Sequence, residues 1–573
     1  MALPVPCLAV RGSIGVVLSN GPPSYVEVSS FKKDDNKSCK AMTFSPDSRY
    51  FAWISHPSVK IALCDSWQIV AVLEKPKVCA IKFSSLGNYL MTWEPFIVSQ
   101  TNPQGNPQLQ IWKSENGQLV KSFTQKRQSD WEPQWSSDEK LCGIRINDDV
   151  LFYENADFET VKYKFNSRKV GKFRIGSGGP PYHVICYLPG KSAEPSFVRL
   201  FEYPKFEPAS SLASKSFFQS DRVDIYWNQK GTSALILTSM DVDKTGSTYY
   251  GKQALHYISV SGETARVTLS DEGPIHAVEW SPKDTEFCVI YGLMPSKATL
   301  FNLKCESVFE FGKKHRNSIY YNPQGNILLL GGFGNLRGGI ELWDTSKRKL
   351  IAQAEAADTT LLEWSPDGQH FMTATTAPRL RVANGFKIWH YTGTLLYERP
   401  WNKQEELWEV LWRVYPRGTF PQTTISYKAV EGIAPSQPQA SKQAYRPPSA
   451  RGQTINFKLH DDDAPVKSQP SKAAIKARRK REAKKVKKEL EQSTAPTTNG
   501  EPNNPPKPRQ KLCDPDLTDD SETNKKIKKI KSKLEGIAQL KEQLASGKQL
   551  QVNQLDKIKK EAELLKELQE LLL

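Results

Sequence analysis

The chain has 573 residues and a formal net charge of +17, a length that allows a large core or several domains. No run of apolar residues is long enough for a membrane span, and the N-terminus lacks the charged start and apolar run of a signal peptide. The nine cysteines are scattered without a CxxC pair, a pattern typical of reduced thiols in the cytoplasm.

Charge and aromatic residues divide the chain near residue 416. All fourteen tryptophans precede this point, and no aromatic residue follows Phe457. Residues 416–573 carry a net charge of about +12, which leaves about +5 for the first 415 residues. We therefore expect a folded body followed by a largely disordered basic tail, which cannot build a packed core. Such a tail favours an acidic partner, most often nucleic acid.

A short motif recurs through the body, mostly at intervals of about 40–50 residues. It consists of an aromatic residue, Ser or Asn, often Pro, a polar turn ending near Gly, and an alternating apolar run. Because Pro presets the first turn position and Gly accepts the awkward dihedral angle, the motif predicts a strand, a tight turn and a second strand. The copies are "FSPDSRYFAW", "FSSLGNYLMTW", "WSSDEKLCG", "WNQKGTSALIL", "WSPKDTEFCVI", "YNPQGNILLL" and "WSPDGQHFMTA".

This period, with four short strands per unit, predicts an all-β fold: a β-propeller over residues 1–430, with nine blades in preference to seven or eight. A degenerate copy is expected at residues 170–190 and a further copy at residues 410–420. Segments such as "IELWDTSKRKLIA" predict the corner between the third and fourth strands of a blade. Only about one and a half strands remain after the last motif, at "TTISYKAV", so we expect residues 8–18 to close the ring.

Several fragments of the body imitate catalytic motifs. The glycines of "GGFGNLRGG" give GxGxxxG, one residue too long for a dinucleotide site, and they precede a predicted strand. Asp241 and Asp243 begin like a calcium loop, but Lys252 takes the place of its final glutamate. The sequence contains no GxxxxGK[ST], HExxH or GxSxG pattern. We therefore predict no catalytic residue, no metal and no cofactor.

Four basic residues lie beside aromatic residues in predicted blade loops. The simplest interpretation is that they are solvated. Together they are candidates for a surface that contacts a phosphate backbone. They are Arg337, Arg379, Arg381 and Lys387.

The tail begins with a Pro- and Ser-rich linker, residues 431–466. Residues 467–490, the basic segment, hold eleven basic residues against two acidic ones and have no continuous apolar stripe. A helix there would be stable mainly against a polyanion, so we predict contact with RNA; a solvated charge run or a nuclear localisation signal is the alternative. The residues assigned to RNA or ribosome binding are Lys476, Arg478, Arg479, Lys480, Arg481, Lys484, Lys485, Lys487 and Lys488.

Residues 491–520 are a predicted disordered spacer, and residues 521–573 predict an amphipathic helical hairpin or coiled coil. Two sets of apolar residues repeat at the same helical spacing on either side of a Gly-containing break. Such a pair is too small to be very stable alone, so we expect it to dock on a partner. The docking candidates are Ile530, Leu534, Ile537, Leu555, Ile558, Leu565 and Leu568.

Several long stretches of the chain resemble the eukaryotic translation initiation factor 2A family. They are "KSFFQSDRVDIYWN", "DVDKTGSTYYG", "IYGLMPSKATLFNLKCESVFEFG", "GGFGNLRGGIELWD", "APRLRVANGFKIWHYTG" and "AYRPPSARG". The final hairpin is also similar to the ribosome-associating tail of the exon-junction partner protein family, whereas residues 453–524 match the first family only in character. The resemblance implies a nine-bladed propeller with a flexible basic C-terminus. It also implies delivery of methionyl initiator tRNA to the small ribosomal subunit, dependent on the codon and independent of GTP.

The leading hypothesis is a non-catalytic, cytoplasmic initiation factor that binds the small ribosomal subunit and initiator methionyl-tRNA. Messenger RNA and other initiation factors are further candidate partners, and no membrane partner is expected. The alternative is a WD-type propeller scaffold for protein contacts within the initiation machinery, without direct tRNA binding. A propeller hydrolase would need a clustered Ser, His and Asp set, which the sequence does not suggest.

Overall fold

The computed structural model describes most of the body and a few positions of the tail. The described residues are 3–98, 103, 105–125, 128–165, 170–190, 194–218, 220–240, 251–402, 404–434, 436, 534, 537, 538, 541, 561 and 565. The chain divides into two compact units, Met1–Ala444 and Tyr445–Leu573.

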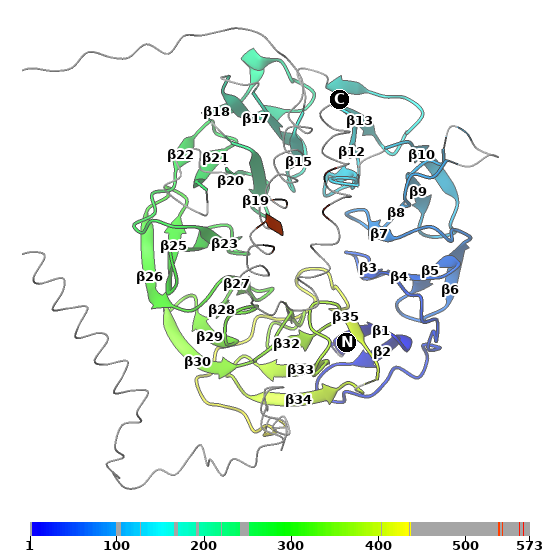
Figure 1. Ribbon diagram of the computed structural model, residues 1–573, viewed down its shortest axis with the longest axis vertical. Coiled ribbons are helices and arrows are strands. Elements are labelled where there is room, and N and C mark those ends of the chain that lie inside the picture. Colours follow the sequence, from blue (N-terminus) through cyan, green and yellow to red (C-terminus); the bar gives the residue numbers. More distant parts are fainter. Residues whose placement is uncertain are drawn as a thin grey trace, which may run out of the picture. The chain divides into compact units, whose positions relative to one another are not determined.

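Nine antiparallel sheets, counted over the described residues, follow one another around a ring (Figure 1). Blades 1–8 have four strands each and blade 9 has three. Within the described residues one 3-10 turn, Pro208–Ser210, follows β17. Blades 1–4 are β3 (Met42–Phe44), β4 (Tyr50–Ser55), β5 (Ser58–Leu63), β6 (Ile69–Leu73); β7 (Ala80–Phe83), β8 (Tyr89–Trp93), β9 (Leu109–Lys113), β10 (Leu119–Phe123); β11 (Gln134–Trp135), β12 (Leu141–Ile146), β13 (Asp149–Glu154), β14 (Tyr163–Phe165); and β15 (Lys172–Ile175), β16 (His183–Leu188), β17 (Ser196–Glu202), β18 (Ala213–Phe217). Blades 5–8 are β19 (Arg222–Trp227), β20 (Ser233–Ser239), β21 (Gln253–Ser259), β22 (Thr264–Arg266); β23 (Ile275–Trp280), β24 (Glu286–Tyr291), β25 (Ser296–Asn302), β26 (Ser307–Lys314); β27 (Ser318–Tyr321), β28 (Ile327–Gly331), β29 (Gly339–Asp344), β30 (Lys349–Glu355); and β31 (Leu361–Trp364), β32 (His370–Thr375), β33 (Gly385–His390), β34 (Leu395–Pro400). Blade 9 is β35 (Leu407–Trp412), β1 (Cys7–Gly12) and β2 (Gly15–Asn20).

The predicted nine-bladed propeller is thus confirmed. The first strand of each four-stranded blade lies nearest the ring centre and the fourth at the rim (Figure 1). The degenerate copy expected at residues 170–190 forms β15 and β16, and "IELWDTSKRKLIA" forms the corner between β29 and β30. Period and turn chemistry therefore located the blades correctly.

In five of the seven motif copies, the side chain of the polar residue fastens the turn between the first two strands. The side chain of Ser45 accepts the N–H of Tyr50 at 2.8 Å, five residues later. In two other blades the Oδ1 of Asn228 and of Asn322 accepts the equivalent N–H at 3.1 and 3.0 Å. Ser and Asn recur there because either can satisfy a turn amide that the sheet leaves unpaired.

The aromatic residue of the motif joins neighbouring blades. The indole N–H of Trp280 donates to the carbonyl of Tyr226 in blade 5 at 2.9 Å, and that of Trp364 donates to the carbonyl of Tyr320 in blade 7 at 3.2 Å. Each indole buries a large apolar surface and also satisfies a backbone acceptor of the adjacent inner strand. The motif therefore fixes the spacing between blades as well as the hairpin itself.

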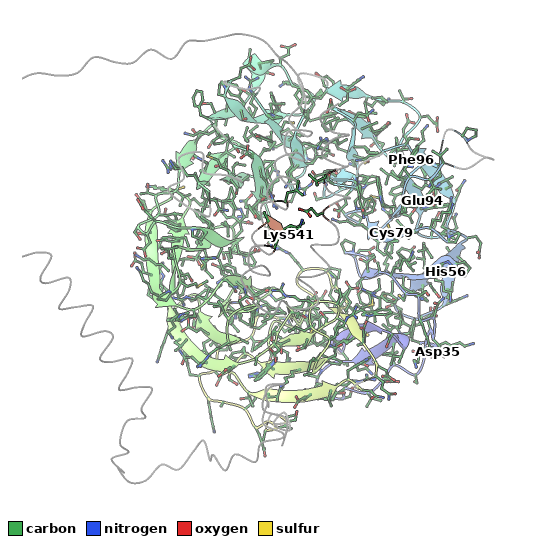
Figure 2. All side chains as sticks on the ribbon, viewed as in Figure 1. Asp35, His56, Cys79, Glu94, Phe96 and Lys541 are labelled. Carbon is green, nitrogen blue, oxygen red and sulfur yellow. The ribbon has the colours of Figure 1, made fainter. Side chains whose placement is uncertain are left out.

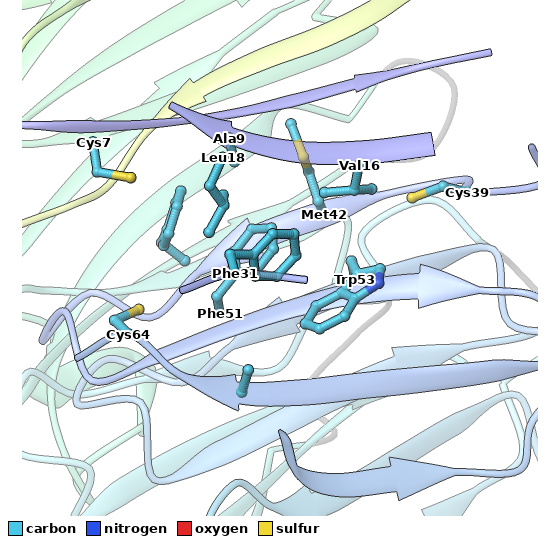
Figure 3. Close-up of a cluster of buried hydrophobic side chains, with 12 residues drawn as sticks. Cys7, Ala9, Val16, Leu18, Phe31, Cys39, Met42, Phe51, Trp53 and Cys64 are labelled. Carbon is cyan, nitrogen blue, oxygen red and sulfur yellow. The ribbon is translucent and has the colours of Figure 1, made fainter. Parts of the chain in front are cut away.

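The hydrophobic core consists of separate clusters between adjacent blades rather than one central mass. Side chains fill the space between neighbouring sheets around the ring (Figure 2). Between blades 9 and 1, Ala9 and Leu18 pack with Phe31, Phe51 and Trp53 (Figure 3). Equivalent clusters link the remaining pairs of neighbouring blades.

Strands from the two ends of the body close the ring. β1 pairs with β35 in antiparallel register, with Val10 opposite Val410, and β2 pairs with β1. The expectation that residues 8–18 would close the ring is confirmed. The outer edge of β2 is covered by residues 26–34, through hydrogen bonds such as Val28 N–H to the Leu18 carbonyl at 2.9 Å.

The prediction that "TTISYKAV" supplies a strand of the last blade is wrong, because residues 423–430 form no strand. They belong to a strap, residues 413–434, that leaves β35 and crosses the ends of blades 7 and 8. Asn326 donates to the Thr423 carbonyl at 3.1 Å, and the Tyr427 hydroxyl donates to Asp344 at 2.8 Å. The edge of β35 is already taken by β1, so these residues bind turns instead of extending a sheet. The copy expected at residues 410–420 accordingly contributes only the end of β35.

The eight cysteines among the described residues are all free thiols. Burial raises the pKa of several of them, including the Cys7 and Cys64 thiols to about 12, so these two are protonated near neutral pH.

Candidate interaction surfaces

The connections of each blade alternate between two faces of the ring, because neighbouring strands run antiparallel. The loop face carries the connections from the second to the third strand, such as residues 332–338 in blade 7 and residues 376–384 in blade 8. It also carries the connections from one blade to the next. The strap face carries the turns from the first to the second strand, together with the strap.

The glycines at residues 332–338 serve the backbone of a tight loop. The N–H of Gly338 donates to the Gly332 carbonyl at 2.8 Å, and the N–H of Gly332 donates to the Gly339 carbonyl at 2.9 Å. Gly338 has a φ of +87°, and a Cβ there would lie 2.1 Å from the Ala356 carbonyl oxygen. The loop leads into β29, a strand, so it lacks the helix N-terminus of a dinucleotide site.

The four basic residues predicted for the propeller fall into two pairs with different surroundings. Arg337 and Arg379 are exposed, and neither forms an ion pair with a described residue. Arg381 pairs with Glu406 at 3.3 Å, and Lys387 pairs with a glutamate of β34 at 3.1 Å. Of these four residues, Arg337 and Arg379 therefore present uncompensated charge on the loop face.

A small polar cavity of about 210 Å³ lies between blades 7 and 8 on this face. Arg379 is at its edge, where a Cβ added to Gly334 would lie 2.7 Å from the guanidinium. Arg379 is the one basic or acidic residue in the lining of this cavity. The charge of Arg379 favours an anionic ligand. The Asn317 side chain, which also lines the cavity, is already hydrogen-bonded to the backbone of Phe333.

A larger cavity of about 970 Å³ lies under the strap, at the inner ends of blades 5–9. Its lining is rich in aromatic and proline side chains and includes Trp227, Trp280, Trp364, Trp412, Tyr415, Pro282, Pro323 and Pro366. Glu363 of β31 also lines it and accepts the Trp412 N–H at 3.1 Å. Burial, with a smaller contribution from the charge of Glu409, raises the pKa of the Glu363 carboxyl to about 7, although the hydrogen bond from the Trp412 backbone N–H lowers it.

Replacing Glu363 by Gln is expected to stabilise the protein at pH 8 and to change little at pH 4.5. The raised pKa means that the folded state keeps a proton that the unfolded chain releases, so wild-type stability falls as the pH rises from about 4.5 to about 7. The amide removes this loss, on the order of 1–3 kcal/mol, and still accepts the Trp412 N–H. Thermal unfolding of both proteins between pH 4.5 and 8 tests this. A difference in midpoint that does not change with pH would contradict it.

The described residues do not assemble an acid–base or metal site. The closest arrangement is the ion pair of His370 with Asp367 at 2.8 Å, but the nearby Ser365 hydroxyl makes no hydrogen bond with either. Burial lowers the pKa of His256 and His390 to about 4, which leaves both neutral near pH 7. No group of three or more potential metal ligands occurs in the described part of the chain. The stretch that begins like a calcium loop, residues 241–252, lies outside the described residues except for Gly251 and Lys252.

The predicted sites of the tail fall largely outside the described residues. This applies to the whole basic cluster, from Lys476 to Lys488, and to Ile530, Leu555, Ile558 and Leu568. Leu534, Ile537 and Leu565 are described and helical. In the same unit Lys541 forms an ion pair with Glu561, which joins the two segments of the predicted hairpin. No helix among the described residues is long and apolar enough to cross a membrane.

Sequence reasoning missed two features of the propeller. One is Arg413, which begins the strap and binds blade 1 through Ser48, Cys64 and Asp65. Its signal in the sequence is an arginine amid apolar residues, in "VLWRVYP", just where the last strand ends. The other is the exposure of Phe218, Leu293 and Val382 in connections of the loop face, which their neighbours in the sequence do not indicate.

Comparisons with known proteins cover both the body and the tail. Residues 215–410 match the family model "Eukaryotic translation initiation factor eIF2A". Eukaryotic translation initiation factor 2A of Drosophila melanogaster is 37% identical over 99% of this chain and 98% of its own, and that of Caenorhabditis elegans is 33% identical over 98% of each. A solved structure titled "Crystal structure of the eukaryotic initiation factor" aligns with 72% of this chain and all of its own, at 32% identity and a TM-score of 0.66.

Proposed function

Because the chain belongs to the eukaryotic translation initiation factor 2A family, we propose that it is a non-catalytic factor that binds the small ribosomal subunit. It directs methionyl initiator tRNA to that subunit, in a manner that depends on the codon and needs no GTP. The observation that carries the proposal is the length of the match: 99% of the chain aligns with the Drosophila relative. That span includes the propeller and the basic tail together.

The parts of the chain have different roles in this proposal. The propeller is a rigid platform, since its blades are joined by buried clusters and closed by β1 and β35. The basic segment contacts RNA phosphates, and the terminal hairpin docks on the ribosome. Arg337 and Arg379 are the propeller residues best placed to add phosphate contacts, because their charges are free, whereas Arg381 and Lys387 would first have to leave their glutamates. Cytoplasmic localisation, and contacts with mRNA and other initiation factors, accompany this role.

Changing Arg478, Arg479, Lys480 and Arg481 together to Ala is expected to weaken RNA binding and flatten its salt dependence. Each lost phosphate contact removes roughly 0.7–0.9 from the magnitude of the slope of log affinity against log salt, so four contacts reduce it by up to about 3.6. Binding of the full-length chain to initiator tRNA, measured between about 50 and 200 mM salt, gives the slope directly.

The tail supplies a matched control for that experiment. Changing Lys525, Lys526, Lys528 and Lys529 to Ala removes the same charge from the predicted hairpin. The slope should then stay close to that of the wild type. An unchanged slope in the first variant, or an equal change in both, would show that the basic segment has no particular role in RNA contact.

A scaffold role remains a second candidate, for one specific reason. Two of the four predicted basic residues of the propeller are neutralised by glutamates on the same surface. Such a surface suits protein contacts better than a phosphate backbone does. Binding of the full-length chain to initiator tRNA no tighter than to a random-RNA control would favour this candidate.

A further inference from the structure

The inner strands of blades 5–8 present tyrosine and glutamate in alternation to the cavity under the strap. In each of these strands, the residue just before the aromatic residue of the motif lines the cavity. These residues are Tyr226 in β19, Glu279 in β23, Tyr320 in β27 and Glu363 in β31. Because the four strands follow one another around the ring (Figure 1), their side chains form one continuous surface, which we call the acidic wall.

Glu279 lies close to the tyrosines on both sides of it. Burial raises the pKa of the Tyr226 and Tyr320 hydroxyls, and among the smaller causes the charge of Glu279 raises the pKa of both. The surrounding protein keeps water from the Glu279 carboxyl and raises its pKa to about 7, although the side chain itself still borders the open cavity. The carboxylate is therefore accessible to a ligand and flanked by aromatic rings.

Neither carboxylate of the acidic wall has a cationic partner among the described residues. The Glu279 side chain forms no ion pair or hydrogen bond with them, and the Glu363 carboxylate accepts only the Trp412 backbone N–H, at 3.1 Å. Two arginines also line the cavity, but Arg413 binds an aspartate of blade 1, and Arg417 is an exposed strap residue without an ion pair in the described part of the chain. The cavity thus holds two uncompensated negative charges.

The tyrosines of the acidic wall are held in place by the contacts between blades. The indoles of Trp280 and Trp364 donate to the backbone carbonyls of Tyr226 and Tyr320, at 2.9 and 3.2 Å. Both tyrosines are only half-buried, so part of each side chain stays open to a ligand. A preorganised surface of aromatic rings and carboxylates attracts a cation, because the ring faces and the carboxylates both carry negative charge.

The composition of the cavity selects one class of ligand. Two uncompensated carboxylates repel the phosphates of RNA. A magnesium or calcium ion needs more oxygen ligands than two carboxylates among aromatic and proline side chains supply. A guanidinium group suits the wall, since it stacks on aromatic rings and donates to carboxylates. The volume of about 970 Å³ exceeds one side chain, and the prolines and aromatic rings of the lining suit an extended peptide that contains proline.

We propose that the acidic wall binds an arginine side chain on an extended, proline-containing segment of a partner protein. The guanidinium packs on the rings of Tyr226 and Tyr320 and pairs with the carboxylates of Glu279 and Glu363. The residues on either side of that arginine lie along the proline and aromatic side chains of the cavity. This inference goes beyond the proposed function, because the site recognises a protein segment and does not depend on RNA binding.

The test titrates full-length chains with two peptides at pH 8, where both carboxyls are largely ionised. One probe is a fluorescent Pro-Pro-Arg-Pro-Pro peptide, and the other has citrulline, an uncharged side chain of similar shape, in place of arginine. One variant carries Glu279→Gln and Glu363→Gln. The matched control carries Glu115→Gln and Glu263→Gln, two exposed glutamates in turns of the same face. We expect the wild type and the control to prefer the arginine peptide about tenfold or more, and the wall variant to bind both peptides equally.

The outcomes separate this inference from the proposed function. If the wild type binds the two peptides equally, or binds neither, the inference is wrong while the proposed function stands. An equal loss of the arginine preference in the control shows that the net charge of the face, and not the wall, attracts the peptide. If the wall variant loses affinity for initiator tRNA, the wall takes part in RNA binding and the inference is again wrong. Glutamine keeps the shape of glutamate, so a thermal midpoint at or above that of the wild type is expected and verifies folding.

Discussion

Replacing Arg316 by Met is expected to lower the free energy of unfolding of the propeller by about 3–5 kcal/mol. Arg316 is 2% exposed, and its Nη1 lies 2.5 Å from the Glu341 carboxylate. Its other amino group donates to the carbonyls of Phe311, at 2.9 Å, and of Gly312. The pair ties the connection between blades 6 and 7 to β29. Removing Arg316 leaves the buried carboxylate with the more exposed Lys314 and the Gln353 amide, which donates to it at 3.3 Å.

Thermal unfolding followed by tryptophan fluorescence tests this prediction, because all fourteen tryptophans lie between residues 53 and 412. The control is the double variant Arg316→Met with Glu341→Met, in which both buried charges are absent. We expect it to recover part of the lost stability, since an apolar pair avoids the cost of burying an unpaired charge. A double variant as unstable as the single one would show that packing, and not the ion pair, sets the cost.

Replacing Arg413 by Ala is expected to cost about 2–4 kcal/mol and to loosen the closure of the ring. Its backbone N–H donates to the Cys7 carbonyl of β1 at 2.7 Å. Its guanidinium binds the Ser48 hydroxyl at 2.7 Å, the Cys64 carbonyl at 3.2 Å and Asp65 at 2.9 Å. One side chain thus links the end of β35 to blade 1 across the point where the two ends of the propeller meet. Without it the carbonyls of Ser48 and Cys64 lose a buried donor.

Hydrogen exchange of β1 and β2 distinguishes this loosening from a general loss of stability. We expect exchange to accelerate in these two strands more than in blades 3–6. Arg413→Lys is the matched control: it keeps the charge but cannot reach all the acceptors of the planar guanidinium, so an intermediate effect is expected. Equal acceleration around the whole ring would contradict a local role in closure.

The repeated hairpin was visible in the sequence because local chemistry determines it. Ser45 and Asn322 fasten their own turns, and the contact spans only five residues. The closure of the ring by residues 8–18 could also be predicted, because a last blade that lacks strands needs another segment to pair with its edge. The strap could not be foreseen, because "TTISYKAV" has the composition of a strand. It does not join the last sheet, because β1 already pairs with β35 there.

The candidate surfaces were harder to predict, because charge in a sequence does not reveal its partners. Arg379 and Arg381 are two residues apart, yet the first is free while the second faces Glu406, which is distant in the sequence. Val382 carries no sequence signal that separates it from a buried valine. Exposure and pairing arise from how loops of different blades meet, which no local pattern encodes.

The central claim is that the chain delivers initiator tRNA to the small ribosomal subunit. The most direct measurement is retention of labelled methionyl initiator tRNA on purified small subunits by the full-length protein, without GTP. It compares mRNA that carries a start codon with mRNA that lacks one, and initiator tRNA with elongator tRNA of equal charge. The account predicts retention that requires both the start codon and the initiator. Equal retention of both tRNAs, or retention indifferent to the codon, would contradict it.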